Sequence, residues 1–320
     1  MEGNNAKEVT IANQELMKME ETTFEAKLCG VADVKFPFVK AAFRAKDGNV
    51  YMGVMLIDTC STRCVLNKSV LPYLDASQLK AGAGTTINTV GAVRSDCQEV
   101  EVELEFKMGN RVFTDTFCVN DTMDFDHMFT SFIGIIGNQF LMKHSLTLDY
   151  SAETLRSSCD FSDDDSHYEF FFPMHFGLEH YDLPVVVLGD KDHRFVMMAD
   201  SGSNDTVLTK HALDEAGITL EATDETGSLT WFNAKEEGTT IGKVHLSLLS
   251  LGSKADEPKV CRYHDTIQVV HTHKYIMDNP TTPNGESSFP ISGMLSSSFM
   301  LEHKWVLDFA HGVMYSLKAA

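Results

Sequence analysis

Apolar and polar residues alternate in short runs along most of this chain. Residues 99–106 read Glu-Val-Glu-Val-Glu-Leu-Glu-Phe, and this period of two predicts a half-buried strand with its charged face in water. Residues 108–111, Met-Gly-Asn-Arg, predict a hairpin turn into a second strand at 112–113. Residues 185–188 and 195–197 repeat the strand–turn–strand pattern. The pattern predicts an all-β protein, mainly β with short helices.

Two segments depart from the alternating pattern. Residues 10–21 place Ile11, Leu16 and Met19 among polar residues, which fits a short amphipathic helix and a flexible arm equally well. Residues 157–166 hold four aspartates among serines, which is typical of a solvated linker. A calcium loop is the alternative, but the ligand spacing and turn glycine of an EF-hand are absent.

The chain contains an internal repeat. Residues 55–62 (Met-Leu-Ile-Asp-Thr-Cys-Ser-Thr) resemble residues 197–204 (Met-Met-Ala-Asp-Ser-Gly-Ser-Asn), 142 positions later (197 − 55). Residues 134–150 resemble residues 293–309 at an offset of 159 (293 − 134). We therefore expect two related lobes, with an N-terminal arm at 1–30, a first lobe at 31–156, an acidic linker at 157–168 and a second lobe at 169–320.

Composition narrows the class of protein. A chain of 320 residues with 43% apolar residues can bury a substantial core. The net charge of -20 argues against a nucleic-acid partner, because nothing offsets repulsion from phosphate. Seven cysteines, an odd number without framework spacing, favour reduced thiols. No signal peptide is visible and no apolar run approaches the roughly 20 residues of a membrane helix, so we expect a cytoplasmic protein with no membrane contact. A signal that had been removed would leave the same pattern.

Asp58 and Asp200 each end an apolar run and precede a hydroxyl residue, one further residue and a second hydroxyl residue. Each copy is followed by a second apolar strand and a helix-like segment. With these motifs the chain resembles the retropepsin-like aspartic proteases, whose pattern is Asp-Thr/Ser-Gly-Ala/Ser/Thr and later two apolar residues and Gly. Residues 200–203 and 135–137 match the two parts well. The resemblance covers most of the chain.

The resemblance implies a fold and an activity. The retroviral enzymes are homodimers, whereas this chain looks like two fused copies, closer in plan to a bilobal pepsin. It implies a bilobal double barrel with pseudo-two-fold symmetry. The implied activity is that of an aspartic-type endopeptidase, which acts on a peptide or protein substrate and uses no cofactor. A monomer suffices if the two lobes complete one site.

The resemblance makes Asp58 and Asp200 the catalytic pair. Two carboxylates held close together do not both ionise, so they share one proton and titrate as a pair. The ionised partner takes a proton from water. The protonated partner polarises the scissile carbonyl and later protonates the leaving nitrogen.

The same resemblance assigns supporting roles to the residues beside the pair. Thr59 and Ser201 would lock the two loops together through their hydroxyls. Ser61 and Ser203 would bond the outer carboxylate oxygens. Gly202 would let the substrate backbone come close, because it has no Cβ.

Each lobe of such an enzyme should also carry a β-hairpin flap. The first is expected at 87–92, around Thr89, Val90 and Gly91. The second is expected at 229–234, where Trp231 and Phe232 either line a substrate pocket or are ordinary core aromatics.

Cys60 and Ser296 depart from the family pattern, which has glycine at both positions. Three interpretations of Cys60 follow. The enzyme tolerates Cys60 with altered specificity; or this half is degenerate, which leaves a retropepsin-like peptide- or protein-binding module; or Cys60 is a redox switch that blocks the site when oxidised.

Other chemistries fit less well. Cys261, His264, His271 and His273 supply a Cys-x2-His and a His-x-His, whereas a zinc site needs about four converging ligands. We therefore expect no metal. The absence of Gly-x-Ser-x-Gly argues against a serine hydrolase of the elbow type.

Overall fold

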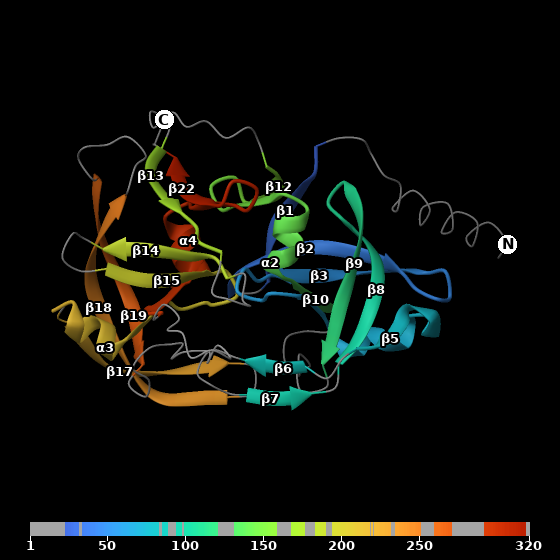
Figure 1. Ribbon diagram of the computed structural model, residues 1–320, viewed down its shortest axis with the longest axis horizontal. Coiled ribbons are helices and arrows are strands. Elements are labelled where there is room, and N and C mark those ends of the chain that lie inside the picture. The colour runs from blue at the N-terminus through green and yellow to red at the C-terminus, as the bar shows by residue number, and fades with distance from the viewer. Residues whose placement is uncertain are drawn as a thin grey trace, which may run out of the picture.

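The computed structural model describes residues 23–31, 34–82, 85–88, 94–97, 99–120, 131–158, 168–176, 183–189, 194–217, 219, 221–231, 234–250, 259–270 and 291–317. Over these residues the protein is mainly β with short helices, which confirms the expected class (Figure 1). It contains one closed barrel of six strands of mixed direction, and a second sheet that is not closed.

The closed barrel belongs to the first repeat. Its strands, in order around the barrel, are β2 (Val34–Arg44), β3 (Val50–Ile57), β10 (Phe132–Ile136), β4 (Cys64–Leu66), β9 (Arg111–Asn120) and β8 (Glu99–Met108). The β3–β10 and β4–β9 pairs are parallel and the other pairs are antiparallel. Pairing of β2 with β8 closes the barrel.

The alternation along β8 explains why this strand has one face in the core. Val102, Leu104 and Phe106 are 0% exposed, whereas Glu103 and Glu105 face solvent. The turn into β9 is the predicted hairpin. Its Gly109 has φ +54, and a Cβ there would lie 2.1 Å from the Glu25 carbonyl oxygen, so glycine is required on both counts.

The second repeat builds an open sheet with the same order. Its strands are β14 (Val185–Gly189), β15 (Arg194–Asp200), β20 (Gly293–Ser296), β16 (Val207–Thr209), β19 (Lys259–Val270), β18 (Ala234–Ser250) and β17 (Glu221–Trp231). The parallel pairs again fall at equivalent places, β15–β20 and β16–β19. β14 lies against β18, but the two strands are not hydrogen-bonded to each other in the described chain. β17 pairs with one edge of β18 and ends the sheet there. The expected second closed barrel is therefore absent from the described residues.

A further set of six strands joins the two repeats, and lies toward the top of Figure 1. Its order is β13 (Tyr168–Pro173), β22 (Val313–Leu317), β21 (Val306–Asp308), β11 (Leu146–Asp149), β12 (Thr154–Ser157) and β1 (Glu25–Val31). Leu148 of the first repeat stands opposite Leu307 of the second, and both are fully buried in one core that includes residues of both repeats. We call this set the bridging sheet. Part of the segment expected as an N-terminal arm, residues 25–30, lies in β1. Residue 157, where the expected linker begins, ends β12, and residue 168, where it ends, begins β13.

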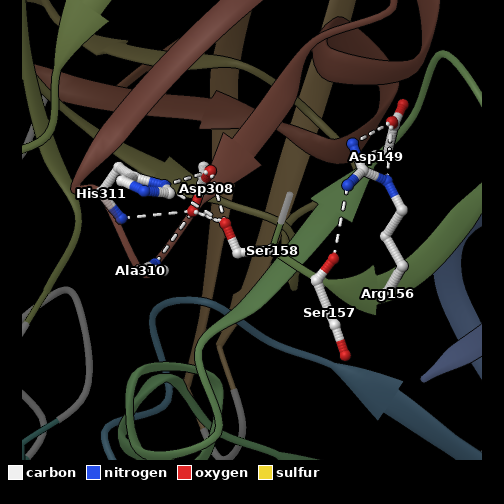
Figure 2. A network of polar contacts seen from close by, with 7 residues as sticks. All are labelled: Asp149, Arg156, Ser157, Ser158, Asp308, Ala310 and His311. Atoms are coloured by element: carbon white, nitrogen blue, oxygen red, sulfur yellow. Dashed lines mark hydrogen bonds and ion pairs between the residues drawn. The ribbon is translucent and has the colours of Figure 1, made fainter. Parts of the chain in front are cut away.

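Two buried carboxylates at equivalent positions of the repeats, Asp149 and Asp308, accept hydrogen bonds in the bridging sheet (Figure 2). Asp149 ends β11 and accepts hydrogen bonds from the Arg156 guanidinium (3.0 and 3.3 Å). Asp308 ends β21 and accepts from the Ser158 hydroxyl (2.9 and 3.0 Å), so the residue just after β12 is tied to β21. His311 Nδ1 lies 2.8 Å from the Asp308 carboxylate.

The remaining described elements are short. They are η1 (Lys68–Tyr73), η2 (Ala76–Gln78), β5 (Leu79–Ala81), β6 (Thr85–Asn88), β7 (Arg94–Cys97), α2 (Asn138–Lys143), α3 (Lys210–Glu215) and α4 (Ser297–Glu302). The helices α2 and α4 follow β10 and β20 at equivalent places in the two repeats. Within the described part of the chain, no helix is long and apolar enough to cross a membrane.

Candidate active site

Asp58 follows β3 and Asp200 ends β15, and the last residues of these two equivalent strands are buried. The residues before them, Ile57 and Ala199, are 0% exposed, so packing in the core holds the end of each strand in place. The two aspartates are themselves buried, at 8% and 9% exposure. The sequence therefore places both carboxyls at the edge of the core, where burial changes their chemistry.

The loops that carry the two aspartates are locked together by four hydrogen bonds. The Thr59 N–H donates to Ser201 Oγ (3.0 Å), and the Ser201 N–H donates to Thr59 Oγ1 (2.9 Å). The Thr59 hydroxyl donates to the Ala199 carbonyl, and the Ser201 hydroxyl donates to the Ile57 carbonyl (2.6 Å). Thr59 and Ser201 are 0% exposed. The expected lock is confirmed, and it fixes one loop relative to the other.

The carboxylates are held by main-chain N–H groups. Asp58 Oδ1 accepts from the N–H groups of Cys60 and Ser61, both at 3.0 Å. Asp200 Oδ1 accepts from the Gly202 N–H at 2.9 Å. The expected role of the serine hydroxyls is wrong. Ser61 Oγ donates to the Arg63 carbonyl (2.8 Å) and Ser203 Oγ to the Asp205 carbonyl (2.9 Å), because each loop turns its own carbonyl toward the hydroxyl.

Gly202 touches both carboxylates. Its N–H bonds Asp200, and a Cβ built on it would lie 2.5 Å from Asp58 Cγ. Burial raises the pKa of Asp58. Burial, and then the nearby charge of Asp58, raise the pKa of Asp200 well above its ordinary value. The two carboxyls therefore act as a coupled pair that retains a proton at a pH where isolated aspartates have lost theirs.

Cys60 packs against the second repeat. Its Sγ lies 3.8 Å from the Ala199 carbonyl oxygen, and its N–H still donates to Asp58. Burial, followed by the charges of Asp200 and Asp58, raises the pKa of the Cys60 thiol well above its usual range. A neutral thiol is a poor target for oxidation, which weighs against the redox-switch interpretation. The side chain packs against an apolar cluster made of Leu183, Val185, Met198, Val207, Ile291 and Met294.

Ser296 has a structural role that explains its departure from glycine. Its hydroxyl accepts an N–H of the first turn of α4 (3.1 Å) and pairs with Thr206 Oγ1 (3.1 Å). The first repeat has Gly137 here, and a Cβ there would lie 2.4 Å from the Arg63 carbonyl oxygen. The Ser296 N–H also donates to Thr206 Oγ1 (3.3 Å), and the residue equivalent to Thr206 in the first repeat is Cys64 (206 − 142). Sequence reasoning missed Thr206, although the repeat offset could have found it.

Thr59→Val is expected to lower the free energy of unfolding by about 2–4 kcal/mol. Valine keeps the shape but leaves the Ser201 N–H without its partner and the Ala199 carbonyl with only the 3.8 Å contact from Cys60 Sγ, and each lost hydrogen bond to a buried group costs about 1–3 kcal/mol. Urea denaturation measures the change. The control is Thr147→Val, because the buried Thr147 hydroxyl has no hydrogen-bond partner among the described residues. Equal losses in both variants would contradict the lock.

The expected flaps are described in part. β6 pairs with β7 as an antiparallel hairpin, with Asn88 opposite Arg94, and the β17–β18 hairpin places Trp231 opposite Ala234. Both hairpins extend along the bottom of Figure 1. Thr89, Val90, Gly91 and Phe232 lie outside the described residues, so their contact with substrate stays a prediction.

Only two of the four candidate metal residues lie in the described part of the chain. Cys261 and His264 are on β19, while His271 and His273 lie outside the described residues. Across the described ranges, no three His, Cys, Asp or Glu side chains are arranged to hold a metal ion.

Comparison with known proteins adds no family assignment. No protein-family model matches the chain, and no curated protein matches it. Only the geometry and chemistry of the site therefore indicate a function for this chain.

Proposed function

We propose that the chain is an aspartic-type endopeptidase with the bilobal plan of the retropepsin-like and pepsin-like enzymes. The observation that carries this proposal is the four-bond lock between Thr59 and Ser201, which holds two buried aspartates from equivalent loops beside one glycine. A lock of this kind has little use in a protein that only needs to pack. Two coupled carboxyls sharing a proton supply a base and an acid at one place.

The reaction follows from that shared proton. The ionised carboxylate takes a proton from water while the water oxygen forms a bond to the scissile carbonyl carbon. The protonated carboxyl donates its hydrogen bond, and then its proton, to the carbonyl oxygen. The resulting diol collapses: one hydroxyl proton returns to the pair, the C–N bond breaks, and the amine leaves with a proton from the pair. Asp58, held by two N–H groups, suits the ionised role, and Asp200, with its more strongly raised pKa, suits the protonated role.

A peptide- or protein-binding module on the same scaffold is the second candidate, because Cys60 replaces the family's glycine. The packing of Cys60 weighs against it. The thiol fills a place against the second repeat's apolar cluster, and the Asp58 loop keeps both of its hydrogen bonds to the carboxylate.

Cleavage of a random peptide library in heavy-oxygen water tests the proposal. Direct attack by water predicts one heavy oxygen in each new carboxyl terminus, no hydroxamate when hydroxylamine is present, and no loss of activity with a chelator. The rate should follow a bell between about pH 4 and 8, since one member of the pair must be ionised and the other protonated. Hydroxamate formation, or a requirement for metal, would contradict the mechanism. Peptide binding without cleavage would favour the binding module.

A further inference from the structure

Behind the Asp200 loop lies a buried tyrosine that comes from the other repeat. Tyr150 follows β11 in the bridging sheet and is 3% exposed. Its N–H donates to the Trp305 carbonyl (3.0 Å), and its hydroxyl lies 3.0 Å from Ser297 Oγ. A first-repeat side chain thus reaches the start of α4 in the second repeat.

Ser297 connects that tyrosine to the Asp200 loop. It is 0% exposed, and its N–H donates to the Ser203 carbonyl (2.8 Å). The Ser203 N–H in turn donates to the Asp200 carbonyl (3.3 Å). Tyr150, Ser297 and Ser203 therefore form a chain of contacts that ends on the catalytic aspartate.

The first repeat has the same main-chain arrangement without the hydroxyl. The Asn138 N–H donates to the Ser61 carbonyl at 2.8 Å, as Ser297 does to Ser203. The equivalent of Tyr150 is Phe309 (309 − 159), whose N–H donates to the Leu146 carbonyl (3.1 Å) and which is 5% exposed. Phenylalanine has no hydroxyl, so this rear support acts on the Asp200 loop alone.

We propose that Tyr150 is a positioning residue that holds the Asp200 loop in register with the Asp58 loop through Ser297. The inference rests on the proposed function. A hydroxyl pair shut away from water is costly to break, because neither group regains a partner from solvent. Burial raises the pKa of Tyr150, so the phenol stays protonated through the working range and acts as a neutral hydrogen-bonding group.

Tyr150→Phe and Ser297→Ala test the inference in enzyme assays. Each is expected to lower kcat by about tenfold with little change in KM, because a small displacement of a reacting group slows chemistry more than it weakens binding. The double variant should lose no more than either single one, since both remove the same contact. The bell-shaped pH profile should narrow, because carboxyls that move apart interact less and their two apparent pKa values converge.

Tyr315→Phe is the matched control, since it removes the hydroxyl of another buried tyrosine, on β22 of the same bridging sheet. It should leave kcat and the pH profile unchanged.

Two results would overturn the positioning role. One is a loss of kcat in the double variant equal to the two single losses combined. The other is a loss of thermal stability in Tyr150→Phe or Ser297→Ala with kcat and the pH profile unchanged. If the wild type cleaves no peptide, the proposed function fails, and NMR titration of the two aspartate carboxyls tests the positioning role separately. Converging pKa values in Tyr150→Phe would support it, and an unchanged separation would overturn it.

Discussion

Asp200→Asn is expected to lower kcat for peptide cleavage by about 10³- to 10⁴-fold, the usual contribution of a positioned acid–base group. Asparagine keeps the size of the side chain and can still accept the Gly202 N–H, so the loop is retained. The amide carries no transferable proton, so the carbonyl oxygen and the leaving nitrogen lose their acid. Steady-state kinetics on any peptide found by library cleavage measure the effect.

The same variant should be more stable than the wild type at neutral pH. Burial and the Asp58 charge raise the folded-state pKa of Asp200 above the value of about 3.9 in an unfolded chain. Between those two pKa values the folded protein binds more protons than the unfolded chain, so the free energy of unfolding falls as pH rises through this window. The amide of the variant does not titrate. The stability gain should therefore be largest at pH values above the folded-state pKa and should vanish near about pH 4.

The pairing of lost activity with gained stability separates a catalytic role from a structural one. Asp214→Asn is the control, because this carboxylate is exposed on α3 and pairs only with Lys210 among its described ion pairs (2.7 Å). It should change neither quantity much. Cleavage that survives in Asp200→Asn would show that another group does the chemistry.

The parts of this site that were predictable from sequence are those set by strand period and by repetition. β3 and β15 are apolar runs that end on an aspartate, so their burial and the equivalence of Asp58 and Asp200 follow from the pattern. The β8–β9 hairpin follows from strict alternation and a glycine turn. The lock through Thr59 and Ser201 followed from a family resemblance.

What sequence could not provide depends on directions and long-range contacts. A serine hydroxyl chooses between a carboxylate and a nearby carbonyl according to the turn of its loop, which is why Ser61 and Ser203 bond elsewhere. The contact between Tyr150 and Ser297 spans 147 residues and leaves no periodic signal. Closure of a sheet depends on which strand edges meet, so two similar repeats give one closed barrel and one open sheet.

Gly202→Ala is expected to lower kcat/KM by about 100-fold or more, the size of effect produced by displacing a reacting group by roughly 1 Å. The added Cβ would lie 2.5–2.7 Å from the three carboxyl atoms of Asp58, and real Cβ contacts are not that short. Either Asp58 or the Gly202 loop must move. The lock prevents the loop from moving freely, because Ser201 beside it holds Ile57 and Thr59. The strain therefore falls on the pair of carboxylates.

Two further variants, Gly30→Ala and Cys60→Gly, separate the possible causes of this loss. Gly30→Ala is the control for the substitution itself, since nothing lies within 4 Å of a Cβ built there, and it should leave cleavage unchanged.

Cys60→Gly makes the first loop match the second. It should change kcat only a few-fold and cost about 1 kcal/mol of stability, because the thiol leaves an apolar cluster and the backbone gains freedom. A large rise in activity in Cys60→Gly would instead show that Cys60 obstructs the site, and would support the binding-module alternative. Little effect from Cys60→Gly beside a large loss from Gly202→Ala would show that only the second loop needs its glycine.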